Sequence, residues 1–227
     1  MLDTNTTNGR IIDAALKAAA AAPWSDVTLP DIAKSAGVSL VELRRAFGSK
    51  GEILAAFVRA VDDEVLARSP LRTSNSTESA RDALFEVIMA RLDVLAPYKP
   101  ALKSINASWN TDRALLAALA NSQTWMLHAA GIPADGIGGG VRSAGLGAVY
   151  ASAFRTWLQD DDPGLARTMA SLDRRLRRGE RALNSLEEVR SKLAGFTTAF
   201  RGPHKRASGD ATTDVASAPE RSPPASA

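Results

Sequence analysis

The twenty residues TLPDIAKSAGVSLVELRRAF, from Thr28 to Phe47, are the feature that most constrains how this chain folds. Gly37 lies in their middle, and a glycine readily adopts the left-handed backbone conformation that ends a helix. Thr28 and Ser39, one on either side, are residue types that cap helix N-termini. Glu42 follows Ser39 at the spacing of a capping box, in which each side chain accepts a hydrogen bond from the other residue's backbone N–H. The stretch therefore predicts two short helices joined by a tight turn.

The apolar residues of this stretch fit a helix-turn-helix, which needs a small residue at the helix crossing and apolar anchors under the second helix. Ala33 is small enough for the crossing, while Leu43 and Phe47 lie four residues apart on one helical face. The other face of the second helix carries Leu40, Val41, Arg44 and Arg45. We therefore expect a helix-turn-helix that turns two arginines outward.

Helical spacing continues through the rest of the chain, and we find no alternating apolar and polar stretch that predicts a strand. The predicted fold class is all-α, with an N-terminal three-helix domain followed by a C-terminal helical domain. The first helix is expected at about residues 9–22, and a helix after the Ser49 cap should run to about residue 68. Prolines and a polar connector divide the remainder into helices at about residues 78–95, 99–107, 112–130, 140–159 and from 163 onward.

These elements divide the chain into four segments. Residues 1–8 are polar and expected to be loose, and residues 9–68 form the helix-turn-helix domain with its connecting helix. Residues 69–201 form the second helical domain. Residues 202–227 are rich in Pro, Ser, Ala and Thr, a composition that predicts disorder. The glycine-rich residues 136–140 predict a flexible loop.

Composition argues against several classes of protein. Cysteine is absent, which excludes disulfides, thiolate metal sites and thiol nucleophiles. No apolar run approaches the length of a membrane span and no signal-peptide pattern is visible, so we expect a cytoplasmic protein. His128 and His204 are the only histidines, and no acid–base pair or nucleophile motif appears. We therefore expect no enzyme, no metal site and no cofactor.

Charge is distributed unevenly along the chain. Residues 1–68 hold 8 Lys/Arg and 9 Asp/Glu, a net charge of −1, whereas residues 163–206 hold 11 and 4, a net charge of +7. The basic run within residues 163–206 predicts a solvated helix face, with Leu172, Leu176 and Leu183 turned inward, and contact with an anionic membrane is the alternative. This run consists of Arg174, Arg175, Arg177, Arg178 and Arg181. Net charge by itself thus does not favour nucleic-acid binding by the N-terminal domain.

The stretches IIDAAL, TLPDIAKSAGVS and FGSKGEILAAF resemble the N-terminal domain of the TetR/AcrR family of transcriptional regulators. The resemblance runs without a gap from Ile11 to about Phe57. It implies a two-domain helical protein that dimerises through its C-terminal helices. It further implies a repressor that binds double-stranded, palindromic operator DNA and leaves it when a small apolar effector enters the C-terminal domain.

The resemblance implies that the DNA contacts lie in and beside the second helix of the motif. The expected contact residues are Thr28, Ser39, Leu40, Val41, Arg44, Arg45 and Lys50. The three basic residues are expected to bind phosphates, and a solvated helix face is the alternative for them. The two apolar residues either meet thymine methyl groups or cover the edge of the core. Glu42 replaces a threonine of the family that commonly touches phosphate, and an ionised carboxylate cannot donate there. Its place in the capping box explains its presence better.

Large side chains at helical spacing in the C-terminal domain are candidates for a ligand pocket. They are Trp109, Trp125, Met126, Tyr150, Phe154 and Trp157. Simple core packing is the alternative for each of them. The helix at about 140–159 also carries many glycines and alanines, which allow close helix approach and make it a candidate dimer face.

The sequence also resembles a second group with the same fold, the accessory lipid-binding proteins of coenzyme Q biosynthesis. In that group the helix-turn-helix is degenerate, and the chain ends in an amphipathic helix that touches membranes. An apolar stripe within residues 183–200 is of this kind, formed by Leu183, Leu186, Val189, Leu193, Phe196 and Phe200. The alternative function is therefore non-enzymatic binding of a lipid or isoprenoid, although membrane contact through 183–200 is not the favoured interpretation.

Overall fold

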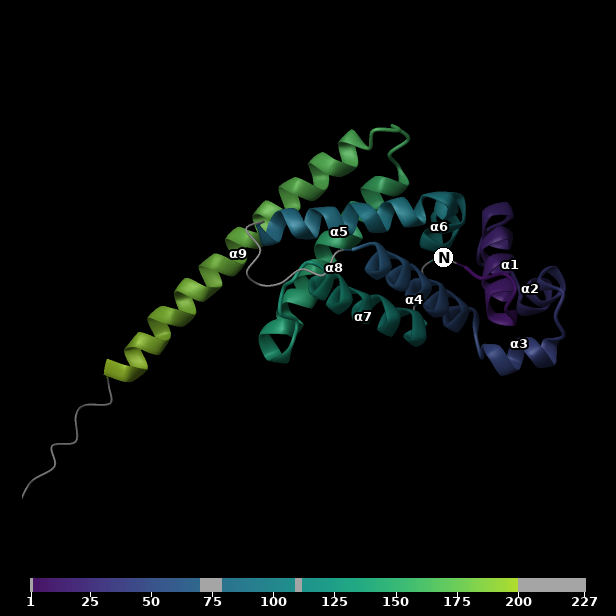
Figure 1. Ribbon diagram of the computed structural model, residues 1–227, viewed down its shortest axis with the longest axis horizontal. Coiled ribbons are helices and arrows are strands. Elements are labelled where there is room, and N and C mark those ends of the chain that lie inside the picture. Colours follow the sequence, from purple (N-terminus) through teal and green to yellow (C-terminus); the bar gives the residue numbers. More distant parts are fainter. Residues whose placement is uncertain (1, 70–78, 109–111, 200–227) are drawn as a thin grey trace, which may run out of the picture. The chain divides into compact units, whose positions relative to one another are not determined.

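The computed structural model describes residues 2–69, 79–108 and 112–199, and the side chains of these residues up to position 182. Every described element is helical, which confirms the all-α prediction (Figure 1). The elements are α1 (Thr7–Ala21), α2 (Leu29–Ala36), α3 (Leu40–Ala46), α4 (Lys50–Arg68), α5 (Ala80–Leu95), the 3₁₀ helix η1 (Ala96–Tyr98), α6 (Lys99–Ala107), α7 (Arg113–Ala129), α8 (Gly136–Leu158) and α9 (Ala166–Ala199).

The N-terminal domain is built on the local signals of the motif. Gly37 adopts a left-handed conformation with φ of 64°, and the Val38 backbone N–H donates to the Ala33 carbonyl at 3.0 Å, which closes the turn. Thr28 and Ser39 both head complete capping boxes. Leu43 and Phe47 are buried, as expected for anchors of α3. These findings confirm the predicted helix-turn-helix.

The start of α4 differs from a full capping box. Ser49 does accept a hydrogen bond from the Glu52 backbone N–H at 3.1 Å. The Glu52 carboxylate, however, accepts from the backbone N–H of Gly48 at 2.7 Å. The Glu52 carboxylate therefore binds the backbone of Gly48 and not that of Ser49, so the second hydrogen bond of a capping box is not formed.

The C-terminal helices pack around a buried polar network. The Arg91 guanidinium of α5 forms an ion pair with Asp62 of α4 and donates from Nε to the Tyr150 hydroxyl of α8 at 3.1 Å. Ser122 of α7 donates to the same Asp62 oxygen at 2.6 Å. Arg91 is 2% exposed and Asp62 is 7% exposed. Because buried charges are stable only when paired, this network fixes α4, α5, α7 and α8 against one another.

The prediction of a loop at residues 136–140 is wrong, because α8 begins at Gly136 and includes all of them. Gly139 is buried, and a Cβ atom there would lie 1.9 Å from the Ala134 carbonyl oxygen. The glycine therefore permits a close approach of the preceding loop to the helix.

In α9 the basic run lies on an exposed face while Leu172 and Leu176 are buried, which confirms that prediction for these residues, and the side chain of Leu183 lies outside those that are described. The apolar stripe at 183–200 lies outside the residues whose side chains are described. The chain divides into two compact units, Met1–Asn184 and Ser185–Ala227. Among the described residues, no helix is both long enough and apolar enough to cross a membrane.

Removing one partner of the buried Arg91–Asp62 ion pair should strongly destabilise the folded protein. Replacing Arg91 by leucine strands the Asp62 carboxylate in the interior, so we expect the free energy of unfolding to fall by about 3–5 kcal/mol. Urea denaturation followed by the helical circular dichroism signal measures this loss. The double variant Arg91→Leu/Asp62→Leu should recover much of it. The exposed pair Arg81–Asp82 offers a control, since Arg81→Gln should cost less than about 1 kcal/mol. Equal losses for the two single variants would contradict the prediction.

Candidate nucleic-acid interface and ligand cavity

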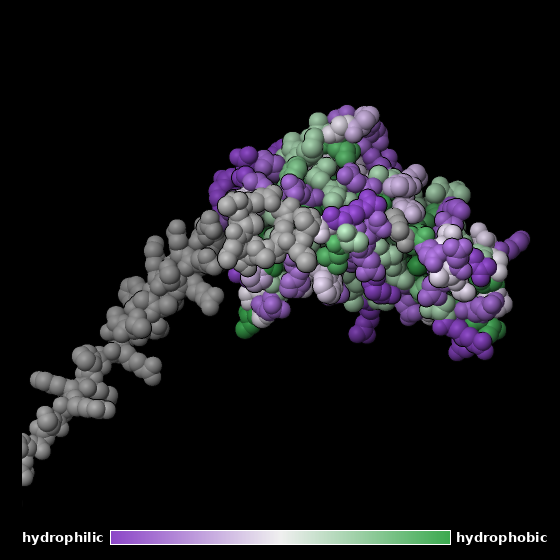
Figure 2. Space-filling model, viewed as in Figure 1, coloured by the Kyte–Doolittle hydropathy of each residue, from purple (hydrophilic) through white to green (hydrophobic). Residues whose placement is uncertain are grey.

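The outward face of α3 exposes apolar and basic side chains together. Leu40 is 54% exposed and Val41 is 59% exposed, whereas Leu43 on the opposite face is 2% exposed. Figure 2 shows hydrophobic and strongly hydrophilic surface next to each other over α3. Leu40 and Val41 therefore do not cover the edge of the core, which was one of their two predicted roles. They are available to an external partner.

Two arginines complete this face. Arg44 and Arg45 are both exposed and lie in the last turn of α3. Neither forms a hydrogen bond or an ion pair with another residue in the part of the chain that the structure describes. Exposed guanidinium groups without a partner bind phosphate readily, because each offers several donors and a permanent charge.

The acidic residue of this helix is held by its own cap. The Glu42 carboxylate accepts hydrogen bonds from the backbone N–H and from the hydroxyl of Ser39, both at 2.7 Å. These bonds, the backbone one first, lower the pKa of Glu42, and the nearby Arg10 and Arg45 lower it further. The capping interpretation of Glu42 is thereby confirmed.

Arg10 is a basic residue that the sequence analysis did not single out. It is exposed on α1, and its charge acts on Glu42 of α3. Only the packing of α1 against α3 brings the two residues near each other, so local sequence patterns gave no signal for it.

The two predicted hydroxyl contacts lie at helix starts and already have partners within the protein. Thr28 donates to the Asp31 carboxylate, and Ser39 donates to the Glu42 carboxylate. Both residues are exposed. Contact of either hydroxyl proton with a phosphate would require the proton to leave its capping carboxylate.

Lys50 is placed differently from the prediction. Its ammonium group donates to the carbonyls of Trp24 at 2.8 Å and Val27 at 2.6 Å. It also lies 4.6 Å from the centroid of the Trp24 ring. Partial burial lowers the pKa of Lys50. The side chain thus fastens the α1–α2 connection to the first turn of α4, and this geometry does not present its charge to a phosphate.

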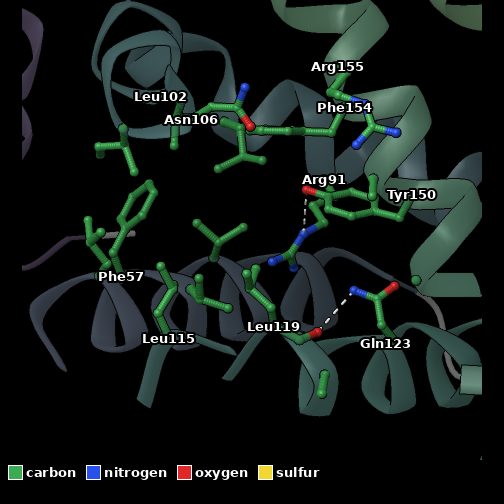
Figure 3. Close-up of a pocket in the computed structure, with 18 of the residues that line it drawn as sticks. Phe57, Arg91, Leu102, Asn106, Leu115, Leu119, Gln123, Tyr150, Phe154 and Arg155 are labelled. Atoms are coloured by element: carbon green, nitrogen blue, oxygen red, sulfur yellow. Dashed lines mark hydrogen bonds between the residues drawn. The ribbon is translucent and has the colours of Figure 1, made fainter. Parts of the chain in front are cut away.

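The C-terminal helices enclose a cavity of about 620 Å³ (Figure 3). Side chains from α4, α5, α6, α7 and α8 line it, and most of them are apolar. Such a volume falls in the range that holds drug-sized molecules. Phe57, Val58 and Val61 of α4 belong to the wall, so the helix that leaves the N-terminal domain also bounds the cavity.

The predicted pocket residues divide between the cavity and other places. Tyr150 and Phe154 line the cavity. Trp157 does not line the cavity. Its ring is fully buried, and the centroid of the ring lies 5.4 Å from the Lys99 ammonium nitrogen. Met126 is packed in the core away from the cavity wall, and Trp125 is 46% exposed, with its ring against His128. Trp109 lies outside the described residues.

One polar side chain of the wall has an unusual environment. Gln123 is 5% exposed and donates from Nε2 to the Leu119 carbonyl at 3.1 Å. Its Oε1 atom is buried and has no hydrogen-bond partner in the part of the chain that the structure describes. Because the atom facing the Leu119 carbonyl must be the donor, the orphan atom is an acceptor.

Comparisons with known proteins agree with this geometry. The family model of the bacterial regulatory proteins of the tetR family matches residues 11–57, and the COQ9 family model matches residues 141–182. A comparison with curated protein sequences finds no match. No group of three or more His, Asp or Glu side chains within the described segments is arranged to hold a metal ion.

Two solved structures share the fold. A TetR transcriptional regulator from Nitrosomonas europaea ATCC 19718 is 24% identical and aligns with a TM-score of 0.58 over 77% of this chain and 98% of its own. A TetR transcriptional regulator from Rhodococcus sp. RHA1 is 20% identical, with a TM-score of 0.57 over 76% of this chain and 94% of its own. The chain therefore resembles the TetR regulators in two respects, the sequence of its helix-turn-helix domain and the fold of its described helices.

Proposed function

We propose that this protein is a TetR-type DNA-binding transcriptional regulator. The observation that carries the proposal is the exposed face of α3, where two arginines and two apolar side chains have no partner in the described part of the chain. A motif kept only for folding would need Leu43 and Phe47 but would not need this combination on its outer side. The match of residues 11–57 to the tetR family supports the same conclusion.

In this proposal α3 enters the major groove of DNA. Arg44 and Arg45 contact phosphates, and Leu40 and Val41 meet thymine methyl groups. Thr28 and Ser39, exposed at the starts of α2 and α3, contact phosphates once their hydroxyl protons turn away from the capping carboxylates. Lys50 is no longer part of the contact set and instead holds the domain together.

The regulator acts as a homodimer, which places two copies of α3 in major grooves about 34–36 Å apart on a palindromic operator. The exposed side of α8 supports this assembly. Gly145 and Ala148 are small and exposed there, and Val141 is 53% exposed. Small residues let two helices approach closely, and the apolar area needs a partner.

Release from DNA follows from the position of α4. Its first residue is bound to the α1–α2 connection, and its middle part forms cavity wall. A small molecule that shifts α4 from inside the cavity therefore also shifts the helix-turn-helix domain. Such a shift changes the spacing of the two recognition helices and lowers the affinity for the operator, as expected of a repressor relieved by an effector.

The DNA-binding role predicts a specific defect in the variant Arg44→Ala/Arg45→Ala. In the homodimer this variant loses four phosphate contacts, two in each protomer, which should weaken binding by about tenfold or more and make the dependence of log affinity on log salt shallower by about 4. A mobility-shift titration on the DNA upstream of the gene, at several salt concentrations, measures both. The matched control is Arg174→Ala/Arg175→Ala on the exposed face of α9. The proposal fails if the two double variants bind alike, or if the unaltered protein shows no salt-dependent shift.

A second candidate function is non-enzymatic lipid or isoprenoid binding. The match of residues 141–182 to the COQ9 family favours it, because this segment contributes Tyr150 and Phe154 to the apolar cavity. In this alternative the outer face of α3 has no function, so replacing Arg44 and Arg45 by alanine should leave lipid binding unchanged.

Liposome flotation separates the two candidates. The lipid-binding alternative predicts that the full chain floats with anionic vesicles and that deletion of residues 183–200 abolishes this, because the deletion removes the apolar stripe. A mobility shift of the same two preparations provides the parallel readout. Flotation that persists after the deletion would exclude this segment as the membrane anchor.

A further inference from the structure

The cavity has an uneven distribution of charge along its wall. Arg91 and Arg155 are the ionisable side chains among its lining residues apart from a tyrosine, and none of the lining residues is acidic. The Arg91 charge is balanced, because Asp62 and the Tyr150 hydroxyl both bind it. Arg155 has no ion pair or hydrogen bond with another residue in the segments that the structure describes. The wall therefore carries one positive charge that no residue in the described segments neutralises through an ion pair or hydrogen bond.

Arg155 stands at the opening of the cavity. It lies on α8 directly after Phe154, and it both lines the cavity and is exposed to solvent. Asn106 of α6 also lines the cavity and is exposed. Figure 3 shows Arg155 and Asn106 on the same side of the cavity, where α6 and α8 border it. A guanidinium and an amide group both offer N–H donors to an anion.

The interior of the cavity is suited to an apolar body. Its lining includes Leu54, Phe57 and Val61 of α4, Leu102 of α6 and Leu115 of α7, all of them apolar. The buried polar atom of its wall, Gln123 Oε1, is an acceptor. A carboxylate placed against Gln123 Oε1 would bring two hydrogen-bond acceptors together, which is unfavourable in a buried environment. The part of the cavity next to Gln123 therefore does not suit a negatively charged group. The charged end of an amphiphile is therefore expected at Arg155.

We propose that the cavity binds a linear monocarboxylate amphiphile, with its hydrocarbon chain inside and its carboxylate at Arg155 and Asn106. This inference rests on the proposed function, since it names the chemical class of the effector that would release the regulator. It assigns to Arg155 the specificity for an acid over a neutral or cationic molecule of the same length. The Coulombic attraction is stronger at a partly apolar opening than in free solution.

Calorimetric titration of the full chain with decanoate and with 1-decanol, at pH 8 and low salt, tests the proposal. At this pH the carboxylic acid is ionised, and the two probes differ only in the head group. Replacing Arg155 by glutamine should weaken decanoate binding about tenfold and leave 1-decanol binding within about twofold, because a charged hydrogen bond is lost for one probe alone. Arg155→Lys should keep part of the preference, since the charge remains.

Matched controls make the outcome decisive. Arg174→Gln removes an exposed arginine of α9 that does not line the cavity, and it should change neither affinity. Decyltrimethylammonium, a cation with the same chain length, should bind more weakly than decanoate. The proposal is overturned if decanoate does not bind the unaltered chain, if Arg155→Gln affects both probes equally, or if the cation binds more tightly than the acid.

The titration contains no DNA, so its failure is distinct from failure of the proposed function. If the chain binds decanoate through Arg155 but shows no salt-dependent DNA shift, the proposed regulator is contradicted and the carboxylate site is supported. If the chain binds DNA through α3 but does not bind decanoate, the proposed regulator is supported and the proposed class of effector is contradicted.

Discussion

The buried ion pair between Arg91 and Asp62 is the interaction on which the C-terminal helices depend. An apolar interior tolerates these charges only because Ser122 and the Tyr150 hydroxyl complete their hydrogen bonds. The four residues belong to α5, α4, α7 and α8, which also supply most of the cavity wall. The network therefore holds together helices that form the cavity wall and maintains the packing of the bundle.

Helix α4 joins this network to the N-terminal domain. Lys50 binds two carbonyls of the α1–α2 connection at one end of the helix, and Asp62 binds Arg91 farther along. The ammonium group exchanges water for carbonyl oxygens and the face of Trp24, which explains how a lysine can be partly buried there. The same helix therefore contacts both the cavity and the α1–α2 connection of the helix-turn-helix domain.

The placement of charge in the N-terminal domain matters more than its sum. Residues 1–68 carry a net charge of −1, which argues against DNA binding when counted alone. The negative charge of Glu42 is held by the Ser39 cap, whereas Arg44 and Arg45 remain exposed. The proposed interface is accordingly more basic than the composition of its domain, because the Glu42 carboxylate is hydrogen-bonded to Ser39 whereas both guanidinium groups are accessible.

Local sequence spacing specifies the features that depend on neighbours three to five residues away. The caps at Thr28 and Ser39, the left-handed turn at Gly37 and the anchors Leu43 and Phe47 all follow from helical geometry, which local spacing fully specifies. The contacts of each large or charged side chain, in contrast, depend on how the helices pack in three dimensions. Helical spacing could not separate Tyr150 and Phe154, which line the cavity, from Trp157, which is buried near Lys99. It could not show that Lys50 binds backbone carbonyls, because its partners lie more than twenty residues away and are brought together only by packing.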